Sequence, residues 1–220
     1  MRAALQFLTI LPVPAPHVAP GEAAVWFPVV GALIGLLAAA AWHTPLGATL
    51  SIAAVIIITG GLHEDGLADV CDALRAGRTR ERMLEILKDS RIGSYGATAI
   101  ALSILVRWQA MAKLAEPGIW WKFAVAFAAA RAAMVVLAAT TPAATPGLGE
   151  SFRTSLPSYA APLAVLPVAA FLPWPALLAG AGSILIARTW FMRRLGGFTG
   201  DGLGFQCQLT EAAVLVALAW

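Results

Sequence analysis

One histidine and four carboxylates, five potential metal ligands, occur within ten residues of one segment, Gly60-Gly61-Leu62-His63-Glu64-Asp65-Gly66-Leu67-Ala68-Asp69-Val70-Cys71-Asp72. If the chain is helical from Gly66 onward, three of them (Asp65, Asp69 and Asp72) share one helix face at positions i, i+4 and i+7. Carboxylates crowded in this way repel each other, and a divalent cation would remove the repulsion. Oxygen ligands of this type favour Mg²⁺, which usually also binds substrate phosphates. The pattern predicts a magnesium site for a phosphorylated substrate, and a solvated acidic face is the alternative.

His63 is a candidate general base or further metal ligand. It directly precedes Glu64 and Asp65, and an imidazole titrates close to neutral pH, where proton transfer is useful. The alternative is a histidine that only satisfies hydrogen bonds inside the fold. We assign His63, Asp65 and Asp69 to catalysis.

A second group of charges lies further along, in the run Lys88-Asp89-Ser90-Arg91-Ile92-Gly93-Ser94-Tyr95-Gly96. The glycines would bend the chain back toward the next apolar segment. We expect Asp89 to support the metal and Arg91 to bind a phosphate group. A charge-capped helix end is the alternative, with Ser90 or Ser94 as the N-cap residue.

The chain also contains a short internal repeat. Residues 60–68 align without gaps with residues 196–204, and both copies read Gly-Gly-x-x-x-Asp-Gly-Leu. Paired glycine-rich breaks in the two halves of a membrane protein indicate a site between the repeats, where backbone amides face anions. We therefore expect a fifth metal ligand at Asp201 and substrate contacts from Gly60, Gly61, Gly197, Thr199 and Gly200. Chance matching in a chain with 20 glycines is the alternative.

The composition predicts an all-α, polytopic membrane protein. The chain is 60% hydrophobic and 12% charged, with a mean hydropathy of +0.79, which excludes an ordinary soluble domain. Apolar runs must satisfy their own backbone groups and are expected to form helices. We treat residues 1–220 as one domain with six or seven spans, of which the fifth and seventh are short: Val25–Trp42, Leu46–Leu62, Ser94–Leu114, Ile119–Thr140, Ala160–Leu172, Ala176–Met192 and Leu209–Trp220.

Basic residues orient the predicted bundle. The segment after the second span is rich in arginine and lysine, whereas the opposite side receives only Lys113 and Lys122. By the positive-inside rule, the loop His63–Gly93 lies on the cytoplasmic face of the cell (inner) membrane. The amphipathic stretch Thr79–Lys88 within this loop is expected to lie along the interface.

Two arginines fall inside predicted spans. Arg131 lies near the middle of its span, where an ionised group costs at least about 2.5 kcal/mol unless it is compensated. Its partner must be a phosphate, a carboxylate or a wet cavity, and we expect a substrate phosphate. Arg107 lies toward the outer half of its span and is expected to snorkel to the surface. Glu211, at the start of the last span, would close the site or cap that helix.

Three motifs in this order resemble the cobalamin synthase family: residues 60–74, 82–96 and 195–204. The opening segments Phe7–Pro14 and Trp26–Gly31 also fit the N-terminal pattern of that family, so the resemblance covers nearly the whole chain. Glu64 is a departure, because the family commonly has an apolar residue at this position.

The resemblance implies an Mg²⁺-dependent adenosylcobinamide-GDP ribazoletransferase. Such an enzyme joins adenosylcobinamide-GDP to α-ribazole, or to α-ribazole 5′-phosphate, and releases GMP. The expected partners are these two small molecules and the lipid bilayer, without nucleic acid; a homo-oligomer is left open. One rival is a CDP-alcohol phosphotransferase, but its Asp-Gly-x-x-Ala-Arg signature lacks the arginine here. A transporter is the other rival, and it would not need an acidic cluster confined to one side.

Overall fold

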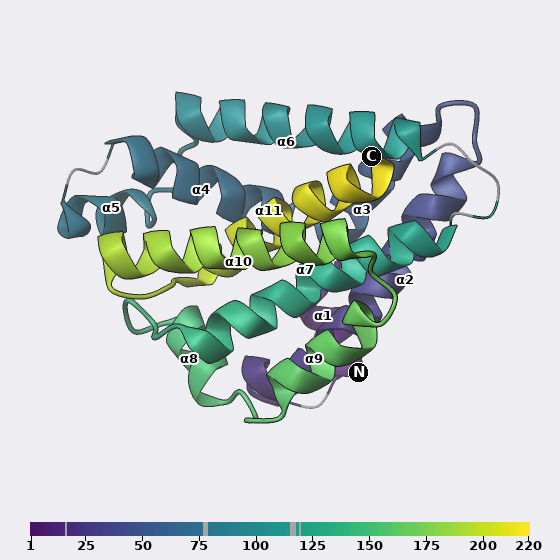
Figure 1. Ribbon diagram of the computed structural model, residues 1–220. Coiled ribbons are helices and arrows are strands. Elements are labelled where there is room, and N and C mark those ends of the chain that lie inside the picture. The colour runs from purple at the N-terminus through teal and green to yellow at the C-terminus, as the bar shows by residue number, and fades with distance from the viewer. Residues whose placement is uncertain (16, 77–78, 115–117, 119) are drawn as a thin grey trace.

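The computed structural model describes residues 1–15, 17–76, 79–114, 118 and 120–220, and its regular elements in these ranges are helices. An isolated β-bridge also joins Ala143 to Phe198. The all-α prediction is therefore confirmed (Figure 1). The helices are α1 (Arg2–Leu8), η1 (Pro20–Trp26), α2 (Phe27–Trp42), α3 (Gly47–Thr59), α4 (Leu62–Ala76), α5 (Arg80–Ile86), α6 (Ser94–Lys113), α7 (Trp120–Thr140), α8 (Leu148–Thr154), α9 (Ala160–Ala169), α10 (Trp174–Leu195) and α11 (Gly200–Ala219).

Fewer helices qualify as membrane spans than the six or seven predicted. Within the described ranges four helices are long and apolar enough to cross a bilayer, and the number rises to five if the bent pair α3–α4 forms one span. The four are Pro20–Trp42, Trp120–Thr140, Trp174–Leu195 and Gly200–Ala219. α6 has the predicted extent but is not among them, and α9 is only 10 residues long. Ile119, the predicted start of the fourth span, lies outside the described residues.

Two predicted boundaries are wrong for the same reason, which is a glycine-rich break. The second span ends at Thr59, and α4 then leaves at 88° to α3. The last helix begins at Gly200, nine residues before the predicted start at Leu209, because the Thr199 hydroxyl caps it by accepting the Gly202 N–H at 3.3 Å. Hydropathy alone misses this start because the first turns of α11 contain glycines and an aspartate.

Both copies of the repeat have the same local structure. Gly60 ends α3 with φ +63°, and Gly196 ends α10 with φ +74°. A left-handed residue of this type terminates a helix, and glycine adopts it without steric cost. In each copy a new helix then begins within four residues, so the Asp-Gly-Leu triplet falls in the first turns of α4 and of α11.

The helix α7 forms the centre of the bundle and is buried along most of its length. α2 packs on one side of it so closely that a Cβ on Gly31 would lie 2.4 Å from the Phe127 carbonyl oxygen. α11 packs on α7 as well, and it also contacts α4, α6 and α10 (Figure 1). This arrangement places the two repeat-bearing helices, α4 and α11, against each other.

Candidate active site

The two repeats meet where α4 crosses α11. A Cβ on Gly66 would lie 2.6 Å from the carbonyl oxygen of Asp201, and a Cβ on Gly204 would lie 3.2 Å from the Gly66 Cα. Only glycine leaves room for such an approach of two backbones. The crossing agrees with the prediction that the two copies of the repeat lie together.

A cavity of about 70 Å³ lies at this crossing and is lined by both aspartates of the repeat, Asp65 and Asp201. His63 contributes to the same wall. A second cavity of about 190 Å³ adjoins it and shares Asp201; its lining includes Lys88 and Thr199. The crossing therefore presents carboxylates from two helices, a histidine and a lysine to neighbouring hollows.

Three carboxylates at the crossing have no cationic partner. Asp65 is exposed, Asp69 and Asp201 are partly buried, and none of them forms an ion pair with a described residue. The negative charges of Asp65, Asp201 and Asp72 all act on Asp69. Such a concentration of uncompensated charge is typical of a site that binds a cation.

Asp72 has a structural role that the sequence analysis missed. Its two carboxylate oxygens accept the backbone N–H groups of Gly93 at 2.7 Å and of Gly96 at 2.9 Å. They thereby satisfy amides at the start of α6, which would otherwise lack partners. Asp72 anchors α6 to α4, and its predicted role as a metal ligand stays a prediction.

Asp89 and Arg91 pair with each other in the loop between α5 and α6. The guanidinium of Arg91 donates from Nε at 2.9 Å and from Nη2 at 2.6 Å. These hydrogen bonds to the ionised carboxylate lower the pKa of Asp89 to about 2. Neither residue lines the two cavities at the crossing, so their predicted metal and phosphate contacts stay predictions.

The predicted glycine and threonine contacts fall into two groups. Thr199 and Gly200 line the larger cavity. Gly60 and Gly61 form the break between α3 and α4, with φ +63° and +70°. Gly197 allows the chain to pass close to another loop, since a Cβ there would lie 2.4 Å from the Pro142 carbonyl oxygen. The last three glycines shape the backbone around the crossing.

The two arginines within predicted spans are both fully buried and ion-paired. Arg107 does not snorkel as expected, because it donates to Glu211 at 2.9 Å and to Glu64 at 3.0 Å. Arg131 pairs with the other oxygen of Glu211, and its guanidinium carbon lies 5.3 Å from the centroid of the Phe127 ring. The carboxylate alternative for Arg131 is thus the one that the structure contains.

Glu211 lies in the middle of α11 and therefore does not cap a helix. The predicted position of Glu211 at the start of the last span is wrong, because the helix begins at Gly200 and not at Leu209. Both of its oxygens are used in ion pairs with Arg107 and Arg131. Glu211 closes a buried charge cluster, which hydropathy could not reveal.

His63 is almost completely buried at the cavity wall. Its exposed fraction is 1%, and its Nε2 atom has no hydrogen-bond partner among the described residues. A buried polar atom without a partner is costly, and such atoms often face a ligand or a buried water. This position is compatible with the predicted role of His63 as a base.

The donor set at the crossing fits Mg²⁺ by its chemistry. Within the described part of the chain, no group of three or more His, Cys, Asp or Glu residues is placed to hold a metal ion by itself. Mg²⁺ does not require one, since it is usually bound through one or two carboxylates, with waters and substrate phosphates as its other ligands. Asp65 and Asp201 at one cavity, with Asp69 within their field, supply hard oxygen ligands of this kind.

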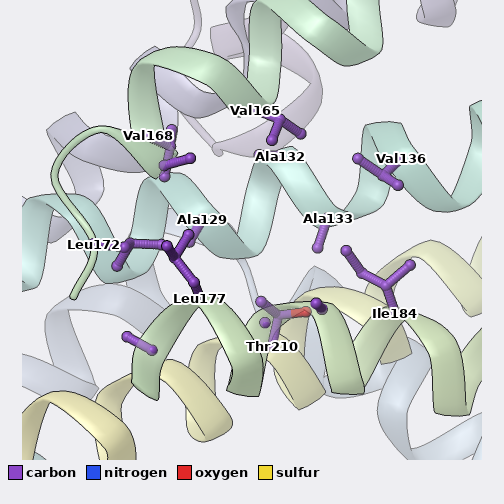
Figure 2. A pocket seen from close by; sticks show the side chains of 14 residues that line it. Ala129, Ala132, Ala133, Val136, Val165, Val168, Leu172, Leu177, Ile184 and Thr210 are labelled. Carbon is purple, nitrogen blue, oxygen red and sulfur yellow. The ribbon is translucent and has the colours of Figure 1, made fainter. Parts of the chain in front are cut away.

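A cavity of about 160 Å³ between α7, α9, α10 and α11 has a different character. Figure 2 shows its wall of alanine, valine and leucine side chains, with Thr210 as the polar exception. The Thr210 hydroxyl is already hydrogen-bonded to Ser183 at 2.8 Å. Because no titratable group lines this cavity, we do not include it in the candidate active site.

The fold and the crossing define a helical membrane protein with a carboxylate-lined site. The chain belongs to the cobalamin-5-phosphate synthase family, whose sequence model matches residues 1–219. It is 40% identical to a protein of Bradyrhizobium diazoefficiens over 100% of this chain and 92% of that one. It is also 40% identical to one of Pseudomonas aeruginosa, with 98% and 96% covered, and 35% identical to one of Ralstonia pickettii, with 99% and 94% covered.

All three relatives are named adenosylcobinamide-GDP ribazoletransferase. No solved structure matches the chain. The comparisons confirm the family resemblance that the three sequence motifs indicated.

Proposed function

We propose that this protein is an adenosylcobinamide-GDP ribazoletransferase of the 2.7.8 type, which transfers a substituted phosphate group. A hydroxyl group of α-ribazole, or of its 5′-phosphate, attacks the phosphoryl group attached to cobinamide. The bond from that phosphorus to the GMP oxygen breaks, GMP leaves, and the hydroxyl proton passes to a base. The observation that carries the proposal is the pair Asp65 and Asp201, uncompensated at one cavity in a chain of this family.

The carboxylates at the crossing would hold Mg²⁺, with Asp65 and Asp201 as the ligands and Asp69 adding negative charge beside them. When bound, Mg²⁺ would neutralise charge on the diphosphate and so make the phosphorus easier to attack. Lys88 and Thr199 line the adjoining cavity. There they are suited to bind and orient a further phosphate group of the substrate.

We assign the role of the base to His63. The imidazole is held rigidly by its burial, and its unpartnered Nε2 belongs to a side chain in the cavity wall. An imidazole that receives the hydroxyl proton during attack would raise the nucleophilicity of the ribazole oxygen.

The membrane setting follows from the apolar helices and the distribution of basic residues. α5 and the loop to α6 contain several exposed arginines, which favour the cytoplasmic side of the inner membrane. The substrates are charged and would then reach the crossing from the cytoplasm.

The direct test measures GMP release from adenosylcobinamide-GDP by the purified protein, with and without α-ribazole and with and without Mg²⁺. We expect release only when ribazole and Mg²⁺ are both present. Asp65→Asn should abolish it, whereas Glu85→Gln, which removes an exposed carboxylate paired with Arg82, should leave it unchanged. Absence of ribazole-dependent GMP release, together with CMP release from a CDP-alcohol, would instead favour the phospholipid-type phosphotransferase.

A further inference from the structure

Four charged side chains form a buried cluster next to the candidate active site. Glu64 precedes Asp65 on α4, Arg107 belongs to α6, Arg131 to α7 and Glu211 to α11. The side chains of both arginines and of Glu211 are completely buried, and that of Glu64 is 8% exposed. Two positive and two negative charges cancel within the cluster.

Arg107 is the residue that joins the two aspartate-bearing helices within this cluster. Its Nη1 donates to Glu211 of α11 at 2.9 Å, and its Nη2 donates to Glu64 of α4 at 3.0 Å. One planar guanidinium thus spans both helices, a geometry that the single ammonium of lysine cannot reproduce. Gln208 reinforces the same connection by donating from α11 to Glu64 at 3.0 Å.

The crossing needs such a connection because its own charges oppose it. Asp65 of α4 and Asp201 of α11 line one cavity, and none of the described residues that line it is a lysine or an arginine. Their repulsion pushes the two helices apart whenever no cation is bound. The glycine contact between Gly66 and Gly204 permits close packing but adds little attraction of its own.

We propose that Arg107 is a positioning residue that holds α4 on α11 and thereby fixes the spacing of the aspartates. Arg131 supports it from α7 by pairing with the second oxygen of Glu211, which orients the carboxylate that Arg107 uses. The inference goes beyond the proposed chemistry, because it assigns no substrate contact to Arg107. Only its metal-binding readout rests on the proposed function.

The first measurement is Mn²⁺ binding to the full-length protein in nanodiscs, without substrate. Electron paramagnetic resonance detects the free and the bound Mn²⁺. We expect Arg107→Gln to weaken binding about 10- to 100-fold, as is typical when a residue that supports metal ligands is lost. Arg107→Lys keeps the charge but bridges only one glutamate, so it should weaken binding in the same direction by a smaller factor. Arg188→Gln is the matched control: among the described residues, Arg188 donates to the Thr140 carbonyl oxygen, away from the buried cluster, and the variant should bind Mn²⁺ as the wild type does.

The second measurement is the distance between α4 and α11, taken with spin labels at the exposed positions Leu74 and Val216. The two free cysteines, Cys71 and Cys207, are first replaced by alanine. We expect a narrow distribution in the wild type and in Arg188→Gln. In both Arg107 variants the distance distribution should be broader or shifted to longer distances. A loss of overall stability alone would not change the distances in the molecules that stay folded.

The outcomes separate this inference from the proposed function. If both Arg107 variants are folded and keep the wild-type distance distribution, the inference is overturned, even if their thermal stability falls. If Arg107→Gln does not fold, Arg107→Lys decides in the same way. If the wild type binds no Mn²⁺, the proposed metal site fails, and the distance measurement still decides the role of Arg107.

Discussion

Two groups of charges include acidic residues of α4 and α11, and they differ in how their charge is compensated. In the buried cluster of Glu64, Arg107, Arg131 and Glu211, every charged group has an oppositely charged partner. At the crossing, by contrast, the acidic side chains of α4 and α11 have no cation from the described chain.

The difference shows that two acidic residues on the same helix can have different roles, one in an internal ion pair and the other in a ligand site. Glu64 and Asp65 are adjacent in sequence, but their side chains leave α4 about 100° apart, so one enters the bundle and the other faces the cavity. Burying a charge requires compensation within the protein. An accessible charge can instead be left for a ligand, at the expense of repulsion in the empty site.

The largest expected effect comes from removing an uncompensated carboxylate. Asp65→Asn and Asp201→Asn should each lower the rate of GMP release by at least about 100-fold, a loss of the size seen when one electrostatic group leaves an active site. Thermal stability should stay the same or rise, because a source of repulsion disappears. Activity at the wild-type level for both variants at low Mg²⁺ would contradict the assignment.

Removing a compensated charge should instead lower the stability of the fold. Arg131→Ala leaves Glu211 buried, with Arg107 as its remaining ion-pair partner. We expect a loss of about 3 kcal/mol in the free energy of unfolding, near the lower end of the range for a broken buried pair. Unfolding in mixed micelles measures it, with Arg188→Ala as the control. A variant with wild-type stability would show that the cluster contributes nothing to the fold.

A substitution at the contact between α4 and α11 should have a smaller effect, on both stability and metal binding. A Cβ at Gly66 would lie 2.6 Å from the Asp201 carbonyl oxygen, so Gly66→Ala must push α11 away. We expect a loss of about 1–3 kcal/mol, the usual penalty for overpacking, together with weaker Mn²⁺ binding. The matched change Gly182→Ala, at a position with no atom within 4 Å, should gain about 0.5–1 kcal/mol from helix propensity.

The smallest effect is expected at the exposed pair Asp89 and Arg91, which resembles the buried pairs only in its chemistry. Solvent screens such a pair, so Asp89→Asn should leave the thermal midpoint at pH 7 unchanged. Because the pKa of Asp89 is lowered to about 2, the contribution of the pair is fully present above the ordinary value of 3.8 and disappears as the pH falls through about 2. A carboxyl carbon NMR titration of Asp89 checks the sign; a pKa above 3.8 would refute the pairing.

The sequence alone was sufficient for the class of fold and for the position of the crossing. Apolar runs of this length satisfy their own backbone groups in a bilayer by forming helices. Gly60 and Gly196 end helices because they adopt a left-handed conformation that other residues avoid. The repeated Asp-Gly-Leu then indicated two helix starts that belong together, and the three motifs indicated the family.

The partners of the charged residues were decided only by the tertiary structure. Asp72 looks like Asp65 and Asp69 on a helical wheel, but it lies beside the amides of Gly93 and Gly96, more than 20 residues away. Arg107 and Arg131 each required a partner, and the sequence offered phosphates and several acids without ranking them. A charged residue type in an apolar span shows that a partner is needed, because burying an unpaired charge is costly. The identity of that partner depends on helix packing. Packing brings Glu64 and Glu211, 147 residues apart in the chain, to the same arginine, Arg107.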